Sequence, residues 1–155
     1  MMCRHCNSSN LKPMIDLGSS PPSNAYLLES DLIRVEKWFP LRVNVCLECF
    51  LVQTEDYTNA DDLFDTDYAY FSSFSKTMLD HSQRYVNDMV NRYGLTDDSM
   101  VIEIAANDGY LLQYVKERGI PCLGIEPTQS TGAAAQKKGI EIVEEFFGVE
   151  LASRL

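Results

Sequence analysis

Four cysteines in two pairs are the residues of this chain best suited to chemistry. Cys3 and Cys6 form one pair with two residues between them, Cys46 and Cys49 form a second, and residues 7–45 separate the pairs. Such a gap lets both thiolates of a tight turn face one ion, and two such turns complete a tetrahedron around Zn²⁺. The longer separating segment costs little, because loop-closure entropy grows only logarithmically with length. The spacing therefore predicts a structural zinc site with no open coordination position.

Other uses of these cysteines are less favoured. A redox pair of the thioredoxin type would explain one such motif within a βαβ unit, but not two that flank a loop rich in Pro and Ser. An iron–sulfur cluster could use four cysteines, yet the spacings differ from those of ferredoxins. His5 lies inside the first pair and is a reserve ligand only. The fifth cysteine, Cys122, is interpreted as a small apolar core residue of a buried strand.

The composition excludes several classes of protein. The chain has 155 residues, with 13 Lys and Arg against 23 Asp and Glu, and a formal net charge of −10. Such an acidic chain lacks the basic surface that binds nucleic acid or anionic membranes. No apolar run approaches the ~20 residues that span a bilayer, and the N-terminus lacks the apolar region of a secretory signal. We therefore expect a cytoplasmic protein, where cysteines hold metal more often than they form disulfides.

The N-terminal part is expected to be β-rich and to end in an acidic linker. Residues 18–24 predict a loop, and the alternation of apolar and polar residues over 41–45 predicts a strand that enters Cys46. Six acidic residues and no basic residue follow within 55–67: Glu55, Asp56, Asp61, Asp62, Asp65 and Asp67. We interpret them as a solvated linker, because a Ca²⁺ loop would need a turn glycine and a terminal Glu that are missing.

The pattern becomes helical from Ser75 to Tyr93, where apolar residues recur every three or four positions and Gly94 provides a stop. His81 lies in this helix and is interpreted as a packing or surface residue. Three short apolar runs follow, at 100–105, 122–126 and 140–143, with helices expected over 109–118 and 130–138. This alternation predicts an α/β fold, the opening of a doubly wound parallel sheet with right-handed crossovers. The run at 100–105 is expected to be buried on both faces.

The turn after the first of these strands is a candidate ligand site. A nucleotide-like ligand would lie there, against the carboxyl end of a strand and the start of a helix. Only Gly109 remains of a glycine-rich pattern, although Ala105 is small and Asn107 tolerates the left-handed region. Glu126, at the end of the second strand, is placed to accept both hydroxyls of a ribose. A generic surface turn followed by an unrelated acid explains the spacing equally well.

Taken together, these motifs resemble the S-adenosylmethionine-dependent C-methyltransferases that act on nucleotide-linked 4-keto deoxysugars. The two cysteine pairs resemble that family's N-terminal zinc-binding domain. The likeness continues through nearly the whole chain, in Asp16-Leu17-Gly18 with Pro22, Asn24-Ala25-Tyr26-Leu27, Asp67-Tyr68-Ala69-Tyr70-Phe71-Ser72-Ser73, His81, Glu103-Ile104-Ala105-Ala106-Asn107-Asp108-Gly109 and Gly124-Ile125-Glu126-Pro127.

The resemblance implies a zinc-binding domain, a helix and the first part of a Rossmann-like, class I methyltransferase sheet. It implies methyl transfer from the sulfonium to a sugar carbon, after a base removes the proton α to the keto group. The residues that would bind the cofactor are Glu103, Ala105, Asn107, Asp108, Gly109, Glu126 and Tyr70, and Tyr68 would reach the sugar. Ala105 stands where the family usually has glycine. The family's catalytic acid and base lie beyond Leu155, so no catalytic residue is assigned.

These implications divide the chain into a zinc-binding domain over 1–56, a linker and helix over 57–98, and a partial S-adenosylmethionine-binding domain over 99–155. Because such a sheet normally has about six strands, we expect the N-terminal portion of an enzyme, inactive alone. Its exposed sheet edges would allow homo-oligomers. The alternative is a non-catalytic zinc-binding module with a protein partner and no adenosyl ligand. An NAD-dependent oxidoreductase is disfavoured by the weak glycine pattern.

Overall fold

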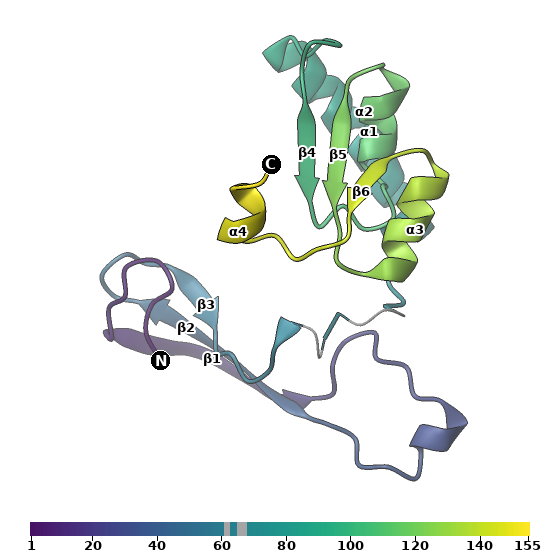
Figure 1. Ribbon diagram of the computed structural model, residues 1–155. Helices are drawn as coiled ribbons and strands as arrows, with labels where there is room; N and C mark the ends of the chain where they lie inside the picture. Colours follow the sequence, from purple (N-terminus) through teal and green to yellow (C-terminus); the bar gives the residue numbers. More distant parts are fainter. Residues whose placement is uncertain (61–62, 65–67) are drawn as a thin grey trace. The chain divides into compact units, whose positions relative to one another are not determined.

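The computed structural model describes residues 1–60, 63–64 and 68–155. These residues form two compact units, Met1–Leu63 and Phe64–Leu155, each with its own three-stranded sheet (Figure 1). Four acids of the predicted linker lie outside the described residues: Asp61, Asp62, Asp65 and Asp67. Among the described helices, none combines the length and the apolar character needed to cross a membrane.

The sheet of the first unit is antiparallel, in the order β1-β2-β3. β1 (Leu11–Ser20) pairs with β2 (Phe39–Cys46), which pairs in turn with β3 (Val52–Thr54). The alternation over residues 41–45 therefore predicts β2 correctly. The connection from β1 to β2 contains one short 3₁₀ helix, η1 (Glu29–Asp31).

The expected loop over residues 18–24 begins too early, because β1 continues to Ser20. The pairing of β1 with β2 is irregular between Asp16 and Ser19, where Gly18 adopts a positive φ of 77°. An irregularity of this kind lets a strand continue past residues that otherwise indicate a turn. The Gly and Ser of this segment thus mark a bulge within the strand, and the prolines that follow mark its end.

The second unit begins with the 3₁₀ helix η3 (Ser72–Phe74) and the helix α1 (Lys76–Tyr93). The hydroxyl of Ser75 accepts the N–H of Met78 at 3.2 Å and caps the start of α1. Gly94 ends the helix in the left-handed conformation, with φ 61°. Both boundaries agree with the prediction. His81 is exposed and stacks on Tyr85, as expected for a surface residue.

The second sheet is parallel, in the order β4-β5-β6. Its strands are β4 (Val101–Ile104), β5 (Cys122–Ile125) and β6 (Glu141–Val143), and they alternate with the helices α2 (Leu112–Glu117) and α3 (Gln129–Lys137). A short helix, α4 (Val149–Ala152), follows. This is the mixed α/β arrangement predicted from the apolar runs, with the topology of a partial Rossmann-like sheet.

The apolar core lies between this sheet and helices α1, α2 and α3, which Figure 1 shows on one side of the strands. Its buried members are Val86, Ala106, Leu112, Val115, Ile120, Ala135 and Ile140, and the half-buried Cys122 packs against them as predicted. The expectation that the strand at 100–105 is buried on both faces is wrong. Ile102 and Ile104 are 47% and 53% exposed, because no described element covers their face of β4.

Helix α2 also starts later than the predicted Gly109. The turn before it holds Asn107 at a φ of 49° and Gly109 at 74°. Neither value fits a right-handed helix, whose φ is near −63°. The segment from the end of β4 to Leu112 is therefore a turn that folds back toward β5.

Candidate functional site

The two cysteine pairs of the first unit occupy turns with the same hydrogen bonds, over residues 3–8 and 46–51. In each turn the first cysteine's carbonyl accepts the N–H of the residue four positions on, at 2.9 Å from Asn7 and 3.0 Å from Phe50. In each, the first cysteine donates its own N–H to the carbonyl five positions on, at 2.9 Å. Because both turns close in this way, each holds two sulfur atoms on one side.

Both turns also require a left-handed residue directly after the second cysteine. Asn7 has φ 59° and Phe50 has φ 62°. Asparagine enters this region more readily than most residues, whereas a bulky aromatic residue does so at a cost of roughly 1–2 kcal/mol. The Phe50 side chain is 74% exposed, so little packing offsets that cost.

The four sulfur atoms form a cluster that fits one zinc ion. Each lies within 4.8 Å of the others, with Sγ–Sγ distances of 3.5 Å from Cys3 to Cys49 and 3.6 Å from Cys6 to Cys46. A tetrahedron with Zn–S bonds near 2.3 Å has edges of about 3.8 Å. The geometry thus agrees with the predicted ligand set. His5 is exposed and lies outside this cluster.

The protonation of the cysteines also indicates a cation. Hydrogen bonding from the backbone of Cys6 lowers the pKa of Cys3 to about 6, even though burial opposes it. The backbone of Ser8 lowers the pKa of Cys6, but burial and the other three sulfur groups outweigh it and raise this pKa to about 12. Four thiolates are therefore not stable together without a positive charge among them, which Zn²⁺ would supply.

A second candidate site lies in the second unit, at the carboxyl ends of β4 and β5. It is a cavity of about 390 Å³, within the range of small-molecule sites. Aromatic and apolar side chains make most of its wall, with three polar residues among them, Ser72, Asn107 and Glu126. Its lining residues are Phe64, Tyr68, Tyr70, Ser72, Ile104, Ala105, Asn107, Tyr110, Ile125, Glu126, Pro127, Phe146 and Phe147.

Glu126 joins the two turns that form the floor of this cavity. Its side chain is 5% exposed, and its Oε2 accepts the backbone N–H of Asn107 at 2.8 Å. Its Oε1 accepts the backbone N–H of Thr128 at 3.0 Å and also the Thr128 hydroxyl. A carboxylate has about four acceptor positions, so Glu126 retains capacity for one further donor from a ligand.

Glu103, on β4, lies behind the cavity wall. Among the described residues its Oε2 is buried without a hydrogen-bond partner. Burial raises the pKa of this carboxyl to about 7, although a hydrogen bond from Tyr110 opposes the shift. Tyr110 also lines the cavity, so this tyrosine contacts both the Glu103 carboxyl and the space for a ligand. An unpartnered buried acceptor beside a cavity fits a ligand that carries hydrogen-bond donors.

Asn107 presents its side chain to the segment that precedes η3. Its Oδ1 accepts the N–H of Ser72 at 2.8 Å, and its Nδ2 donates to the carbonyl of Tyr70 at 3.0 Å. Asp108 extends this contact, because its Oδ1 accepts the N–H of Ser73 at 3.3 Å. Lys138 holds Asp108 in turn, through the Asp108 carbonyl at 2.6 Å and an ion pair at 3.5 Å. These side chains fix the Tyr70 wall of the cavity.

The backbone of the β4–α2 turn is constrained by its small residues. Ala105 has φ 59°, a left-handed value. Gly109 has φ 74°, and an added Cβ would collide with Cδ1 of Ile140 and crowd Cβ of Ala135 at 3.2 Å. Gly109 is therefore required by its conformation and by close packing, whereas Ala105 is strained.

The predicted cofactor residues thus fall into two groups. Ala105, Asn107, Glu126 and Tyr70 line the cavity, as does Tyr68, the predicted sugar contact. The others support the wall from behind, and their binding roles stay predictions: Glu103, Asp108 and Gly109. Sequence reasoning missed the aromatic residues Phe64, Tyr110, Phe146 and Phe147. The only feature of the sequence that could have identified them is their aromatic character.

Comparisons with known proteins bear on both units. Residues 3–64 match the family described as "Putative zinc binding domain", and this range includes all four cysteines of the cluster. The chain is also 29% identical over 153 residues to the C-methyltransferase NovU of Streptomyces niveus. That alignment covers 99% of this chain and 36% of the relative, so the chain spans about a third of the relative's length. These findings confirm the resemblance predicted from the motifs.

Proposed function

We propose, on the premise that its N-terminal part is a zinc-binding domain of the C-methyltransferase family, that this chain supplies the structural zinc site and an S-adenosylmethionine-binding surface of such an enzyme. We infer that the methyl acceptor is a nucleotide-linked keto deoxysugar. The bound cofactor would supply an activated methyl group on its sulfonium. The chain's own residues would bind and orient that cofactor.

The observation that carries this proposal is the position of the cavity. It opens at the carboxyl ends of two adjacent parallel strands, where nucleotide-type ligands bind in doubly wound sheets. Glu126 stands at the end of β5, where an acid accepts ribose hydroxyls, and its remaining acceptor capacity would suit one of the two. The aromatic side chains of the wall provide flat surfaces on which an adenine ring would stack.

The charges around the cavity support the same ligand. Glu103 and Asp108 lie behind the wall and Glu126 lies in the floor. Asp108 is paired with Lys138 and Glu103 has a raised pKa, so Glu126 is the carboxylate that the ligand would meet. A carboxylate in the lining favours a cation, and S-adenosylmethionine carries a sulfonium and an ammonium. Tyr68 would be directed to the sugar, since it lines the same cavity on the segment that Asn107 holds.

The proposal is tested by ligand-detected NMR on the full chain with S-adenosylhomocysteine, a method that detects weak binding. We expect saturation transfer to the adenine protons, and competition by S-adenosylmethionine but not by NAD. In Tyr70→Ala the affinity is expected to fall about 10-fold, the loss of one aromatic contact. The matched control is Tyr85→Ala on α1, because both tyrosines are 47% exposed and only Tyr70 lines the cavity.

The outcomes separate the two leading functions. Binding that Tyr70→Ala weakens and Tyr85→Ala does not supports the cofactor role. A folded, zinc-loaded chain that fails to bind S-adenosylhomocysteine contradicts that role and favours a zinc-binding interaction module. Equal competition by NAD contradicts the methyltransferase assignment of the cavity.

A further inference from the structure

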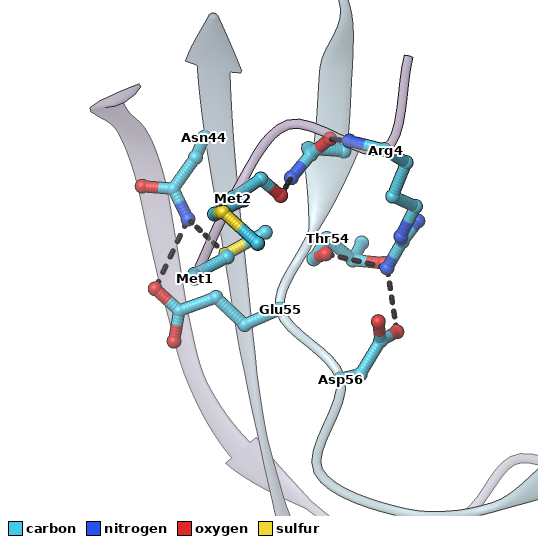
Figure 2. Close-up of polar contacts among 8 residues, drawn as sticks. Met1, Met2, Arg4, Asn44, Thr54, Glu55 and Asp56 are labelled. Carbon is cyan, nitrogen blue, oxygen red and sulfur yellow. Dashed lines mark hydrogen bonds and ion pairs between the residues drawn. The ribbon is translucent and has the colours of Figure 1, made fainter. Parts of the chain in front are cut away.

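The side chain of Gln53 lies against the chain on both sides of a zinc ligand. Its Oε1 accepts the backbone N–H of Arg4 at 3.0 Å, and its Nε2 donates to the carbonyl of Met2 at 3.2 Å. Met2 and Arg4 are the two neighbours of Cys3. Figure 2 shows this segment, with Met2 and Arg4 against the strands that carry Thr54 and Asn44. One carboxamide thus forms the pair of hydrogen bonds that a neighbouring strand would form.

The environment of the Gln53 side chain is suited to these two hydrogen bonds. Its side chain is 4% exposed, and a buried amide left without partners would be costly. Both ends of the carboxamide are satisfied by the backbone beside Cys3. The position is therefore specific for a side chain with one donor and one acceptor at this length.

The location of Gln53 connects the two cysteine turns. It is the central residue of β3 and pairs with Asn44 on β2, two residues before Cys46. β3 itself follows the second cysteine turn directly. Gln53 therefore links the first cysteine turn to the hairpin that carries the second.

The other side-chain contacts of this segment are exposed or weak. The Arg4 guanidinium donates to the Thr54 carbonyl at 2.8 Å and pairs with Asp56, whose side chain is 75% exposed (Figure 2). Exposed ion pairs contribute about 0–1 kcal/mol. The Nδ2 of Asn44 lies 3.8 Å from the Met1 sulfur, a weak contact. Gln53 is thus the buried tie between residues 2–4 and the sheet.

We propose that Gln53 is a positioning residue of the zinc site. By fixing the backbone on both sides of Cys3, it holds this ligand at the distance that the other three sulfur atoms require. Without it residues 2–4 would lose their buried hydrogen bonds to β3, and the metal would have to fix the position of Cys3 against the sheet. Removing the carboxamide therefore weakens zinc binding while all four ligands remain.

The test uses the full chain loaded with zinc, and follows the transfer of zinc to an excess of a coloured chelator. Gln53→Met keeps the length of the side chain but forms neither hydrogen bond. Partners that orient metal ligands typically contribute 10-fold to 100-fold in metal affinity, and we expect zinc affinity to fall within that range. Gln53→Glu retains the acceptor for Arg4 and loses the donor, so it is expected to lie between the parent and Gln53→Met.

Two controls separate positioning from general destabilisation. Arg4→Met removes the exposed ion pair in the same turn and is expected to change zinc affinity less than 2-fold, an effect of about 0.4 kcal/mol. Gln113→Met makes the same substitution in the second unit, where Gln113 donates to the Tyr110 carbonyl at 2.8 Å, and should leave zinc affinity unchanged.

Two further readouts identify the mechanism. Co²⁺ in place of zinc should give the absorption of a tetrahedral four-thiolate site in the parent and in both Gln53 variants. The Arg4 amide proton should exchange slowly in the zinc-loaded parent and rapidly in Gln53→Met. Parent-like zinc affinity in Gln53→Met overturns the proposal. A changed Co²⁺ spectrum overturns it as well, because the ligands themselves would then have changed.

Discussion

The two units of this chain differ in what lies at their centres. In the described part of Met1–Leu63, the buried apolar side chains are those of Cys3 and Cys46, which belong to the four-cysteine cluster. In Phe64–Leu155 the centre is an apolar cluster that joins α1, α2 and α3 to the parallel sheet. The first unit is organised around a cluster of cysteine sulfur atoms, and the second around a core of apolar side chains.

This difference shows how two short segments become stable in different ways. A segment of about 60 residues buries too small a fraction of its surface to gain much from the hydrophobic effect. A structural zinc site supplies folding free energy directly, on the order of 10–16 kcal/mol in zinc-binding peptides. The second unit is instead stabilised by apolar packing. Helix α1, which precedes the strands of the sheet, contributes Val86 to that core. The comparison predicts that each unit fails for its own reason.

The largest effect is expected from the loss of a zinc ligand. Cys46→Ser removes one thiolate, and we expect the first unit to lose both zinc and folded structure, since the metal contributes more than a typical domain's net stability. The second unit should remain folded. Zinc content measures the first result, and hydrogen exchange, followed separately for peptides of the two units, measures the second.

The control for this change is Cys122→Ser, which alters a cysteine that packs against the core of the second unit. It should retain one zinc ion per chain and protected amides throughout residues 1–60. If Cys46→Ser exposed the amides of both units equally, the two centres would not be independent, and the comparison would fail.

An intermediate effect on the stability of the second unit is expected from the ionisation of the buried Glu103 carboxyl. Its pKa is raised from 4.5 to about 7 in the folded protein. The folded state therefore binds this proton more tightly, and the associated stability is fully present below pH 4.5 and lost as the pH rises through 7. The full contribution is about 3 kcal/mol, of which about 1.4 kcal/mol is lost between about pH 6 and about pH 8.

Chemical unfolding followed by far-ultraviolet circular dichroism measures this loss, because the described α-helices all lie in the second unit. In Glu103→Gln the decrease between these pH values should be smaller by the same amount. Zinc content at both pH values provides the control for the first unit. An unchanged pH dependence in Glu103→Gln would show that another group is responsible.

The smallest effect on stability is expected from substitutions of the residues that have a left-handed backbone conformation, Phe50 in the first unit and Ala105 in the second. Phe50→Gly should stabilise the first unit and Ala105→Gly the second, each by about 0.5–1 kcal/mol, after the greater flexibility of glycine in the unfolded chain is subtracted. Denaturant midpoints at a fixed zinc concentration, from Trp38 fluorescence and circular dichroism respectively, measure the two changes.

Each variant serves as the control for the other, because each should move only the midpoint of its own unit. Destabilisation by Phe50→Gly would mean that the phenyl ring contributes more than its exposed position indicates. Destabilisation by Ala105→Gly would mean that the methyl group packs productively in the cavity wall.

Local patterns predicted much of this structure. The cysteine spacing predicted that the four cysteines come together, because this cluster depends on two tight turns and little else. The helix from Lys76 to Tyr93 was predicted together with its stop at Gly94, since both depend on neighbouring residues. The order of strands and helices in the second unit followed from apolar runs interrupted by glycines.

Features that depend on distant partners were not predicted. The exposure of Ile102 and Ile104 depends on what covers the sheet, which an apolar strand does not encode. The role of Asn107 depends on the Tyr70–Ser72 backbone, far from it in sequence. Gln53 carried no signal at all, because a single glutamine in a short strand resembles any solvent-facing residue.

The placement of the two cysteine turns at either end of residues 7–45 has a consequence for how this region can evolve. A metal ion held by both turns acts as a cross-link that closes a long loop, much as a disulfide would. Doubling the length of such a loop costs only about 0.6 kcal/mol. The connection between β1 and β2 can therefore accept insertions, deletions and new sequence at little thermodynamic cost. The cross-link would preserve the domain through such changes.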